Sequence, residues 1–467
     1  MAAAAAVTQR GAEAVICGAG IAGIATAYHL AVEYGMRRLI LVDERPPLTL
    51  TSDKSTECYR NWWPGPGSGM VDLMNRSIDK LDAWAHDSGN PFQLNRRGYL
   101  FATGRQEQAE TYLELGTEIS QLGAGPLRVH RGEPGDPDYR PQPAEGFLDQ
   151  PTGADLLLDR SLIQRYFPYL TDDTVAVLHA RRCGWFSAQQ LGQFLLSRAR
   201  HAGVELVEGK LETVQTDDAG ISGVTIATGA GDVHIDTRRL VIAAGPKINE
   251  VAGLLGQTLP VYCELHSKVA MADPLGAVPR AAPLLIWSDR QQIPWSASER
   301  VELAADPETR WLTEPLPEGA HTRPEGPDSS PIILILWTYH TNPVEPVFPV
   351  PHDTRLYPEV ALRGMSTMIP GLRRYFDQLP RPVVDGGYYV KTQENRPLIT
   401  PLPVDGAYLI GALSGFGLMA SPAAGELLAA HVVGGELPAY ERWFRLDRYQ
   451  DPVYQELLRH WEDSGQL

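Results

Sequence analysis

A glycine-rich turn between two apolar runs, within residues 15–44, constrains the fold of this chain more than any other feature. The first run covers 15–17 and ends at the turn GAGIAG (18–23). A helical pattern follows, and the second run (39–42) ends at Asp43. This order of strand, glycine turn, helix, strand and acid predicts the first unit of a dinucleotide-binding α/β domain.

Each glycine of the turn has a separate role in such a domain. Gly18 allows the sharp turn, Gly20 lets the backbone approach a pyrophosphate, and Gly23 lets the helix pack against the strand. The helix N-terminus offers free N–H groups to the phosphates. Asp43 lies about 20 positions after Gly23, where an acid bonds the ribose hydroxyls and favours FAD or NAD over NADP. The contacts expected here are Gly18, Gly20, Ile21, Ala22, Gly23, Asp43 and Glu44.

Size and charge limit the class of protein. A chain of 467 residues is too long for one hydrophobic core, so we expect two domains. Hydrophobic residues at 43% and charged residues at 21% are typical of a soluble globular protein. The net charge of −16 argues against nucleic acid or an anionic membrane surface as a partner. No apolar run approaches the roughly 20 residues that span a bilayer, so no membrane span is expected.

The cysteines and the start of the sequence bear on metal binding and location. Cys17, Cys58, Cys183 and Cys263 form no CxxC pair and have no histidine cluster beside them, so we expect no metal site. Scattered cysteines are typical of a reducing compartment. The opening MAAAAAVTQR lacks the basic segment and long apolar run of a signal peptide. We therefore expect a cytoplasmic protein.

Features of a nucleotide-binding domain recur in three separate parts of the chain, and segments rich in Pro, Gly, charge or Trp lie between them. We expect these intervening segments to form one second domain, inserted twice. The predicted division is a nucleotide-binding domain of residues 1–89, 176–254 and 381–440, a substrate domain of 90–175 and 255–380, and a C-terminal packing tail of 441–467.

Hydrophobic periodicity predicts elements within this division. Helices are expected over 106–122, 188–202 and 423–433, strands over 240–245, 264–272, 331–339 and 407–411, and an antiparallel ribbon over 220–237. The segment 313–331 has the composition of a surface loop. The predicted fold class is α/β with mixed α+β character, and its second domain is a discontinuous mixed sheet.

Three motifs, in this order, resemble those of a known group of flavoproteins. They are GAGIAG with its distant acid, LVIAAG (240–245) and GALSGFGLMASPAAGELLA (411–429). Together they resemble the group that includes D-amino acid oxidase, glycine oxidase and sarcosine oxidase, over nearly the whole chain. The resemblance implies a p-hydroxybenzoate hydroxylase-like fold, a Rossmann-like domain that binds FAD, and hydride transfer to flavin N5 from a carbon next to an amine nitrogen.

The resemblance also implies which further residues hold FAD. The hydroxyl-rich segment 51–56 would contact the pyrophosphate and flavin with added charge from Lys54, although polar turns of this kind are common. The turn 411–417 would cradle the flavin, and the helix after it would direct its N-terminus at flavin N1 and O2. The expected contacts are Ser52, Ser55, Thr56, Leu211, Ala244, Gly245, Gly411, Ser414, Gly415, Phe416, Gly417, Leu418 and Met419.

By the same resemblance, the expected catalytic residues are Arg60, His340 and Tyr389. Arg60 matches an arginine that grips the substrate carboxylate, and a guanidinium suits that role through paired bonds; a structural ion pair is the alternative. His340, at the end of an expected strand, would orient the amine, or would lie on the rim with no role. Tyr389 would form a wall of the substrate pocket.

Three departures from sarcosine oxidase bear on mechanism. Gly387 stands where that enzyme has its flavin-linked cysteine, so FAD is expected to be non-covalent, with a link through Cys58 as the lesser alternative. Met419 replaces a carboxylate-binding lysine, which leaves Arg396 as a possible substitute. Leu336 replaces the lysine that activates O2, unless Lys268 or Lys391 reaches the same place.

The predicted function is FAD-dependent oxidation of a C–N bond in an amine or amino-acid-like small molecule, with O2, a quinone or a carrier protein as electron acceptor. Met419 and Leu336 favour an alternative, a dehydrogenase or oxidative-cyclisation enzyme acting on a larger substrate with an acceptor other than O2. The tryptophans of the second domain agree with a bulky substrate, and equally with a structural core. A flavin-binding scaffold or assembly factor without turnover is the alternative of another class.

Overall fold

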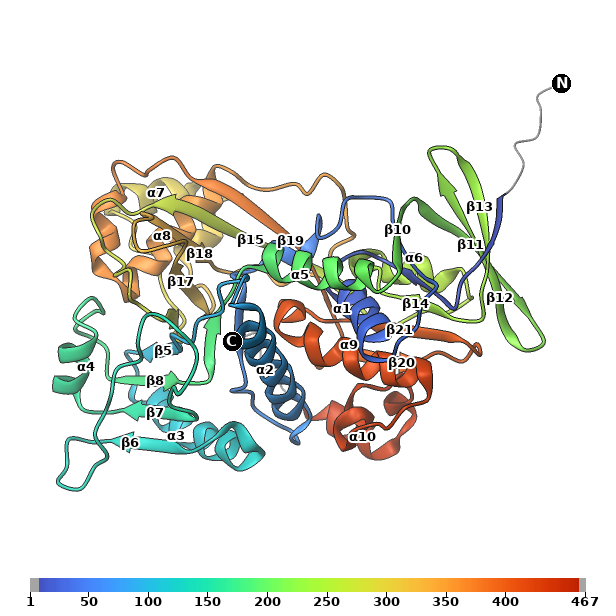
Figure 1. Ribbon diagram of the computed structural model, residues 1–467. Coiled ribbons are helices and arrows are strands. Elements are labelled where there is room, and N and C mark those ends of the chain that lie inside the picture. Colours follow the sequence, from blue (N-terminus) through green and yellow to red (C-terminus); the bar gives the residue numbers. More distant parts are fainter. Residues whose placement is uncertain (1–7, 462–467) are drawn as a thin grey trace.

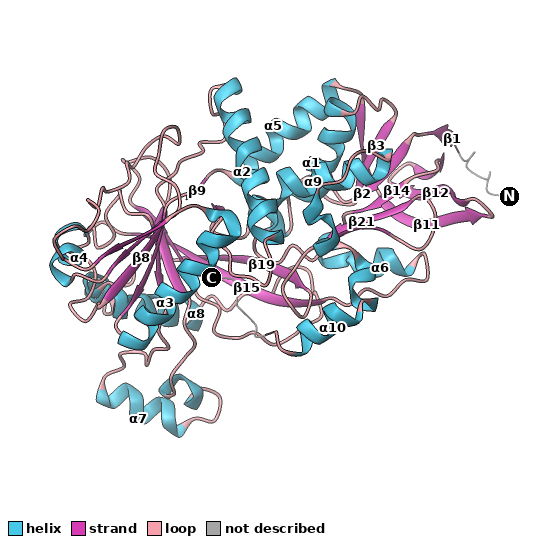
Figure 2. Ribbon diagram, turned by 90° about the horizontal axis from the view of Figure 1, so that it is seen from below, coloured by secondary structure: helices cyan, strands magenta, loops and turns pink. Residues whose placement is uncertain are grey.

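Two large sheets organise the computed structural model, which describes residues 8–461. A six-stranded and a nine-stranded sheet lie in opposite halves of the molecule. The long strands β15 (Tyr262–Ala272) and β19 (Val383–Lys391) run between the two halves (Figure 2). The first residues of the predicted nucleotide-binding domain and the last residues of the predicted tail lie outside the described part of the chain.

The six-stranded sheet joins the three parts of the chain that carry the nucleotide-binding features. Its order is β10-β3-β2-β14-β21-β20, and all neighbours are parallel except β20 and β21. The strands are β2 (Ala14–Cys17), β3 (Leu39–Asp43), β10 (Val204–Glu208), β14 (Leu240–Ile242), β20 (Leu398–Pro401) and β21 (Ala407–Gly411). The strands predicted at the glycine motifs are therefore confirmed, and they meet in one sheet.

Both faces of this sheet are covered, as the period of two along β2 requires. Ala14 and Ile16 share a core with helices on one face, whereas Val15 and Cys17 share a core with a β-ribbon on the other. The helices are α1 (Ile21–Tyr28), α2 (Gly69–Ser88), α5 (Ala188–His201) and α9 (Gly417–Val433) (Figure 1). The ribbon is β1 (Thr8–Gly11), β13 (Gly231–Asp236), β12 (Gly220–Thr228) and β11 (Lys210–Asp217), in this order.

Helix α9 begins at Gly417 rather than at the predicted position 423. The prediction placed the start after Pro422, which has no N–H for the carbonyl of Leu418. Here Ser421 Oγ donates to that carbonyl at 3.1 Å. The helix therefore continues across the proline, and its N-terminus lies at the glycine turn.

The nine-stranded sheet has the order β19-β15-β18-β17-β16-β5-β8-β7-β6. Its remaining strands are β5 (Tyr99–Thr103), β6 (Leu127–His130), β7 (Ala154–Leu157), β8 (Ala176–Ala180), β16 (Leu284–Trp287), β17 (Ala320–Pro324) and β18 (Ile332–Leu336). The accompanying helices are α3 (Gln106–Ile119), α4 (Arg160–Tyr166), α7 (Ala297–Ala305) and α8 (Leu356–Met368). Helix α6 (Ile248–Gly253) follows β14 in the other half.

Two predictions in this half are wrong in detail. Residues 320–324 of the expected surface loop form β17, a buried interior strand. Its charge is tolerated because Arg323 pairs with Glu325 at 2.5 Å and donates to the Thr56 carbonyl at 2.6 Å. The strand expected over 331–339 ends at Leu336.

Strand pairing divides the chain slightly differently from the predicted boundaries. Strands β8 and β19 were assigned to the nucleotide-binding segments 176–254 and 381–440, but both pair within the nine-stranded sheet. Residue propensities can indicate that a segment is a strand, but tertiary packing determines which other strand it pairs with. The crossing of β19 between the halves brings its side chains to both.

The C-terminal segment packs on the nucleotide-binding half. It has 3₁₀ turns at Ala439–Phe444 and Leu446–Gln450, followed by α10 (Pro452–Arg459). Buried Glu394 anchors it, since one carboxylate oxygen accepts from Arg448 at 2.7 Å, Tyr449 at 2.8 Å and Tyr454 at 3.0 Å. These bonds hold the C-terminal segment against the loop that precedes β20.

Candidate active site

Three neighbouring cavities run from the end of β3 to the glycine turn before α9. The outer cavity, of about 360 Å³, lies against Asp43 and Glu44. The connecting cavity, of about 90 Å³, lies between the two glycine turns. The inner cavity, of about 300 Å³, shares Ser55, Tyr389 and Gly415 with the connecting one. The three together make an elongated space along the carboxyl edge of the parallel strands.

Most residues predicted to bind the cofactor line this space. The outer cavity is lined by Gly18, Asp43, Glu44, Leu211 and Ala244. The connecting cavity is lined by Gly20, Ile21, Ala22, Ser52, Ser55, Gly245, Gly411, Ser414, Gly415, Gly417 and Leu418. Thr56, Phe416 and Met419 line the inner cavity. Gly23 lies beneath the turn and lines none of the three.

Asp43 is fixed by backbone bonds at the first turn. Its Oδ2 accepts from Ala19 N at 2.7 Å, and its Oδ1 accepts from Arg45 N at 2.9 Å. Burial raises the pKa of this carboxyl despite these two bonds. Each oxygen retains acceptor capacity toward the outer cavity, as contact with ribose hydroxyls requires.

The second turn is held in a backbone conformation that non-glycine residues seldom adopt. Ala412 and Ser414 have positive φ angles of 51° and 46°. Such angles persist where the surrounding structure fixes them and cluster at binding sites. They direct the chain into α9, whose N-terminus is a favourable position for negative charge.

These features fit FAD. The lining of the three cavities runs from an acid at the end of β3 to a second helix N-terminus, and hydroxyls of Ser52 and Ser55 border its centre. Ile21 N donates to Ser52 Oγ at 2.9 Å, which shows that the first turn and the segment 51–56 converge. Lys54, expected to add charge there, instead pairs with Asp385 at 3.0 Å and Asp53 at 3.2 Å.

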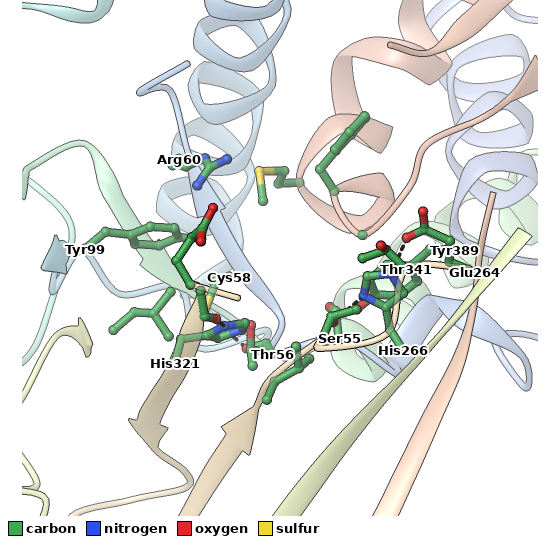
Figure 3. A pocket seen from close by; sticks show the side chains of 18 of the residues that line it. Ser55, Thr56, Cys58, Arg60, Tyr99, Glu264, His266, His321, Thr341 and Tyr389 are labelled. Carbon is green, nitrogen blue, oxygen red and sulfur yellow. Dashed lines mark hydrogen bonds and ion pairs between the residues drawn. The ribbon is translucent and has the colours of Figure 1, made fainter. Parts of the chain in front are cut away.

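Arg60 lies at one end of the inner cavity (Figure 3). The short strand β4 (Cys58–Arg60) pairs with β9 (Cys183–Trp185) and fixes its position. The guanidinium lies 4.1 Å from the ring centroid of Trp63 and is buried, so desolvation lowers its pKa. A buried guanidinium in contact with aromatic rings gains from an anionic ligand that lies against it.

His321 and Cys58 lie at the same end of the cavity. Burial lowers the pKa of His321 to about 4, and its Nδ1 lies 2.8 Å from the Gly319 carbonyl oxygen. The imidazole is therefore neutral at pH 7 and donates its proton to that carbonyl. Burial raises the pKa of the Cys58 thiol, which lies 3.2 Å from the Thr56 carbonyl oxygen. The thiol is therefore protonated at neutral pH.

A hydrogen-bonded chain of polar side chains occupies the opposite end, where Figure 3 shows Glu264, His266 and Tyr389. Thr338 Oγ1 lies 2.7 Å from His266 Nδ1, and His266 Nε2 lies 2.9 Å from Glu264 Oε2. Lys391 Nζ donates to Glu264 Oε1 at 3.3 Å. The Tyr389 ring stacks on the imidazole with a centroid distance of 4.0 Å and an interplanar angle of 24°. All five residues line the cavity.

The structure brings together two of the three residues expected to be catalytic. Arg60 and Tyr389 line the inner cavity. His340 does not; it is exposed and packs against Trp311 and Tyr339. Strand β18 ends at Leu336, and the chain then leaves the sheet. Position 340 therefore does not have the orientation that it would have in a longer strand.

Lysine and arginine positions clarify the departures from sarcosine oxidase. Arg396 donates to the carbonyls of Pro64 and Gly65 and does not line the cavity. Lys268 bonds the carbonyls of Asp53 and Ser55 and is likewise absent from the lining. Within residues 8–461, Lys391 is the lysine that reaches the cavity, and Glu264 holds it.

The position of Gly387 is also explained. A Cβ there would lie 3.2 Å from Lys54 Cβ and 3.3 Å from Thr51 Cα, which leaves little space for a cysteine. Glycine at this position has no side chain that could bond the flavin.

Reasoning from the sequence missed Glu264, His266, Thr338, Tyr99 and His321 in the cavity. Two of these residues follow a pattern that could have been recognised in the sequence. Glu264 and His266 occupy alternate positions in a strand that was predicted correctly, and polar residues at i and i+2 of a buried strand indicate a polar site on one face.

Comparison with known proteins agrees with the geometry. A family model described as FAD dependent oxidoreductase (DAO) matches residues 13–431. The site and fold are thus those of a flavoprotein oxidoreductase, and the chain belongs to the DAO family of FAD-dependent oxidoreductases. A search of curated proteins gave no match.

Several solved structures share the fold. L-proline dehydrogenase from P. horikoshii has a TM-score of 0.71 at 18% identity, covering 95% of this chain and 98% of its own. Glycine oxidase from Geobacillus kaustophilus has a TM-score of 0.68 at 17% identity, covering 95% and 99%. Iminodiacetate oxidase from Chelativorans sp. has a TM-score of 0.66 at 18% identity, covering 93% and 98%. At these identities the likeness concerns the fold.

Two absences are observed in the described part of the chain. Among residues 8–461, no three His, Cys, Asp or Glu side chains are grouped so that they could hold a metal ion. None of the helices in this range has the length and apolar character needed to cross a bilayer.

Proposed function

We propose that this FAD-dependent enzyme oxidises a C–N bond of an amino-acid-like substrate. The observation that carries the proposal is the inner cavity, which places buried Arg60 at one end and the Thr338–His266 pair at the other, beside the flavin-binding turn at Gly415. A molecule with a carboxylate and an amine matches both ends. The cavity volume of about 300 Å³ suits a small or medium-sized amino acid.

When bound, FAD supplies a hydride acceptor at N5. Arg60 would hold the substrate carboxylate, since its buried charge gains more from an anion than an exposed one would. Tyr389 and Phe416 would bound the substrate, because both are buried and line the cavity. Their apolar surface would exclude water from the reacting carbon.

Leu336 favours a particular class of electron acceptor. It is buried and lines the cavity, and the nearby Lys391 is bound to Glu264. Positive charge beside a flavin promotes the first electron transfer to O2, and here much of that charge is neutralised. A dehydrogenase that uses a quinone or carrier protein is therefore the second candidate.

The test is anaerobic mixing of the flavin-loaded protein with a panel of amino acids, N-methyl amino acids and simple amines, read at the flavin absorbance near 450 nm. Bleaching by amines that carry a carboxylate, and weaker bleaching by the matching decarboxylated amines, is the expected result. A protein that binds FAD but is bleached by no member of the panel would be the scaffold alternative.

Re-oxidation of the reduced protein by air then separates the two acceptors. Fast return of the absorbance supports an oxidase, whereas slow return that a soluble quinone accelerates supports a dehydrogenase.

A further inference from the structure

Both ring nitrogens of His266 are engaged by protein groups, and this fixes the tautomer of the imidazole. Glu264 is a carboxylate and only accepts, so Nε2 carries the proton and donates to Oε2 at 2.9 Å. Nδ1 is then a bare acceptor, and the hydroxyl at 2.7 Å, Thr338 Oγ1, must donate to it. Thr338 lines the inner cavity, and its hydroxyl oxygen, while donating to His266, can still accept a hydrogen bond from a group bound there.

We propose that Thr338, His266 and Glu264 form a proton relay that removes one proton from the ammonium group of the substrate. The relay rests on the proposed function, because it requires an amine at that end of the cavity. It supplies a step that FAD does not: an amino acid is an ammonium at neutral pH, whereas hydride loss from the adjacent carbon needs the nitrogen lone pair.

The transfer balances without any change of oxidation state. One N–H bond of the substrate ammonium breaks and its proton bonds to Thr338 Oγ1. The original hydroxyl proton moves to His266 Nδ1, forming a new N–H bond. The substrate becomes a neutral amine and His266 becomes an imidazolium, so the total charge is unchanged. After the product leaves, the imidazolium loses this proton to water and the relay is restored.

The surroundings of His266 keep its imidazole neutral at rest and place a carboxylate beside it. Burial lowers the pKa of the imidazole, although Glu264 acts against this effect, so the resting ring is neutral. Burial raises the pKa of Glu264, but its bond to His266 and the charge of Lys391 outweigh burial, and the carboxyl is ionised. This carboxylate stabilises the imidazolium when it forms.

The other groups that face His266 set limits on the relay. Lys391, on β19, opposes an imidazolium and shares the charge of Glu264. Tyr389, on the same strand, is protonated because burial raises its pKa, so it adds no charge and fixes the plane of the ring by stacking. His321, on β17, is neutral. Glu264 is therefore the negative charge among these groups.

The relay is tested by binding, with two probes that cannot be oxidised. 2-Aminoisobutyrate has an amine and a carboxylate but no hydrogen on the α-carbon, and 2-hydroxyisobutyrate has the same shape with no ammonium proton to give. Their dissociation constants are measured by calorimetry on the flavin-loaded protein at pH 7.5. The variants are Thr338→Val, which keeps the shape, Thr338→Ser, which keeps the hydroxyl, and His266→Asn.

We expect Thr338→Val and His266→Asn to weaken 2-aminoisobutyrate by about ten-fold or more, the cost of a lost hydrogen bond to a charged group. 2-Hydroxyisobutyrate should change by less than about two-fold, and Thr338→Ser should bind both probes as the wild type does. Ser267→Ala is a control on the opposite face of β15, and it should leave both constants unchanged.

Three results would overturn the relay. Equal weakening of the two probes in Thr338→Val would assign Thr338 a role in shape only. Identical pH profiles of flavin reduction in the wild type and in His266→Asn would exclude His266 as the acceptor. Both results leave the proposed function in place, whereas failure of the wild type to bind either probe, with no bleaching in the amine panel, would overturn the proposed function and the relay together.

Discussion

The carbonyl oxygen of Gly18 occupies the place of the missing Gly23 side chain: a Cβ added at Gly23 would lie 1.9 Å from it. Helix α1 therefore packs directly on the turn that precedes it. Gly20 differs, because beyond its two chain neighbours the described residues place only Ser52 Oγ, at 3.2 Å, within 4 Å of a Cβ added there. Gly23 serves packing, while Gly20 keeps open the cavity that it lines.

Replacing Gly20 with Val should abolish FAD retention while the protein stays folded. The side chain would occupy the connecting cavity, which measures only about 90 Å³. The ratio of flavin to protein absorbance after purification measures the effect. Gly229→Val in the β-ribbon is a matched control, since a Cβ there meets no atom within 4 Å in the described chain. A Gly20→Val protein that is fully loaded with flavin would contradict the assignment.

Replacing Arg60 with Met should weaken a carboxylate-bearing substrate by at least about ten-fold and leave FAD bound. Arg60→Lys should recover little of the loss, because an ammonium cannot make the paired bonds of a guanidinium. The readout is KM, or Kd for a bleaching amine, beside the same measurement on the decarboxylated amine. The decarboxylated compound should respond weakly to either change. An unchanged KM for the carboxylate would remove Arg60 from this role.

The nucleotide-binding half could be predicted from sequence because its chemistry is largely backbone chemistry. Turns at Gly18 and Gly415 are marked by residue types that few other structures require, and each motif is local. Their convergence follows from parallel strands, whose carboxyl ends meet at one edge of a sheet. The resemblance added the order of the motifs, and the strand pairing agrees with it.

The substrate end of the site was harder to predict because strands distant in sequence form it. His266 and Thr338 are neighbours only because β15 pairs with β18, and no local pattern specifies that pairing. Composition misled at 320–324, where the charge of Arg323 is balanced within the fold. His340 was misplaced because the expected strand ends early.

The pH profile of flavin reduction should separate the relay from simple selection of neutral amine. In the wild type, the relay works while His266 is neutral, and burial keeps its pKa below the ordinary value of 6.5. The reduction rate at saturating amine should therefore be level through neutral pH and fall only as the pH drops through that lowered pKa. In His266→Asn the ammonium keeps its proton, so the rate should rise about ten-fold per pH unit up to the pKa of the bound amine. Stopped-flow traces between pH 5.5 and 9.5 give both curves, and identical curves would exclude His266.

Replacing Glu394 with Ala should destabilise the protein by about 3–5 kcal/mol, because the buried charge of Arg448 would lose its partner. Burial raises the pKa of Glu394, but Arg448 outweighs it and the net pKa is lowered. A lowered carboxyl pKa contributes stability above the unfolded-state pKa, near 4.5, and this contribution is lost as the pH falls through the folded-state pKa. The wild-type advantage should thus be full at pH 7 and shrink below about pH 4.5.

Urea unfolding at several pH values measures this difference in stability, and limited proteolysis near α10 shows whether the tail is released. Glu456→Ala, an exposed member of an ion pair on α10, is the control and should stay within about 0.5 kcal/mol of wild type; an equal effect of the two changes would mean that Glu394 does not anchor the tail.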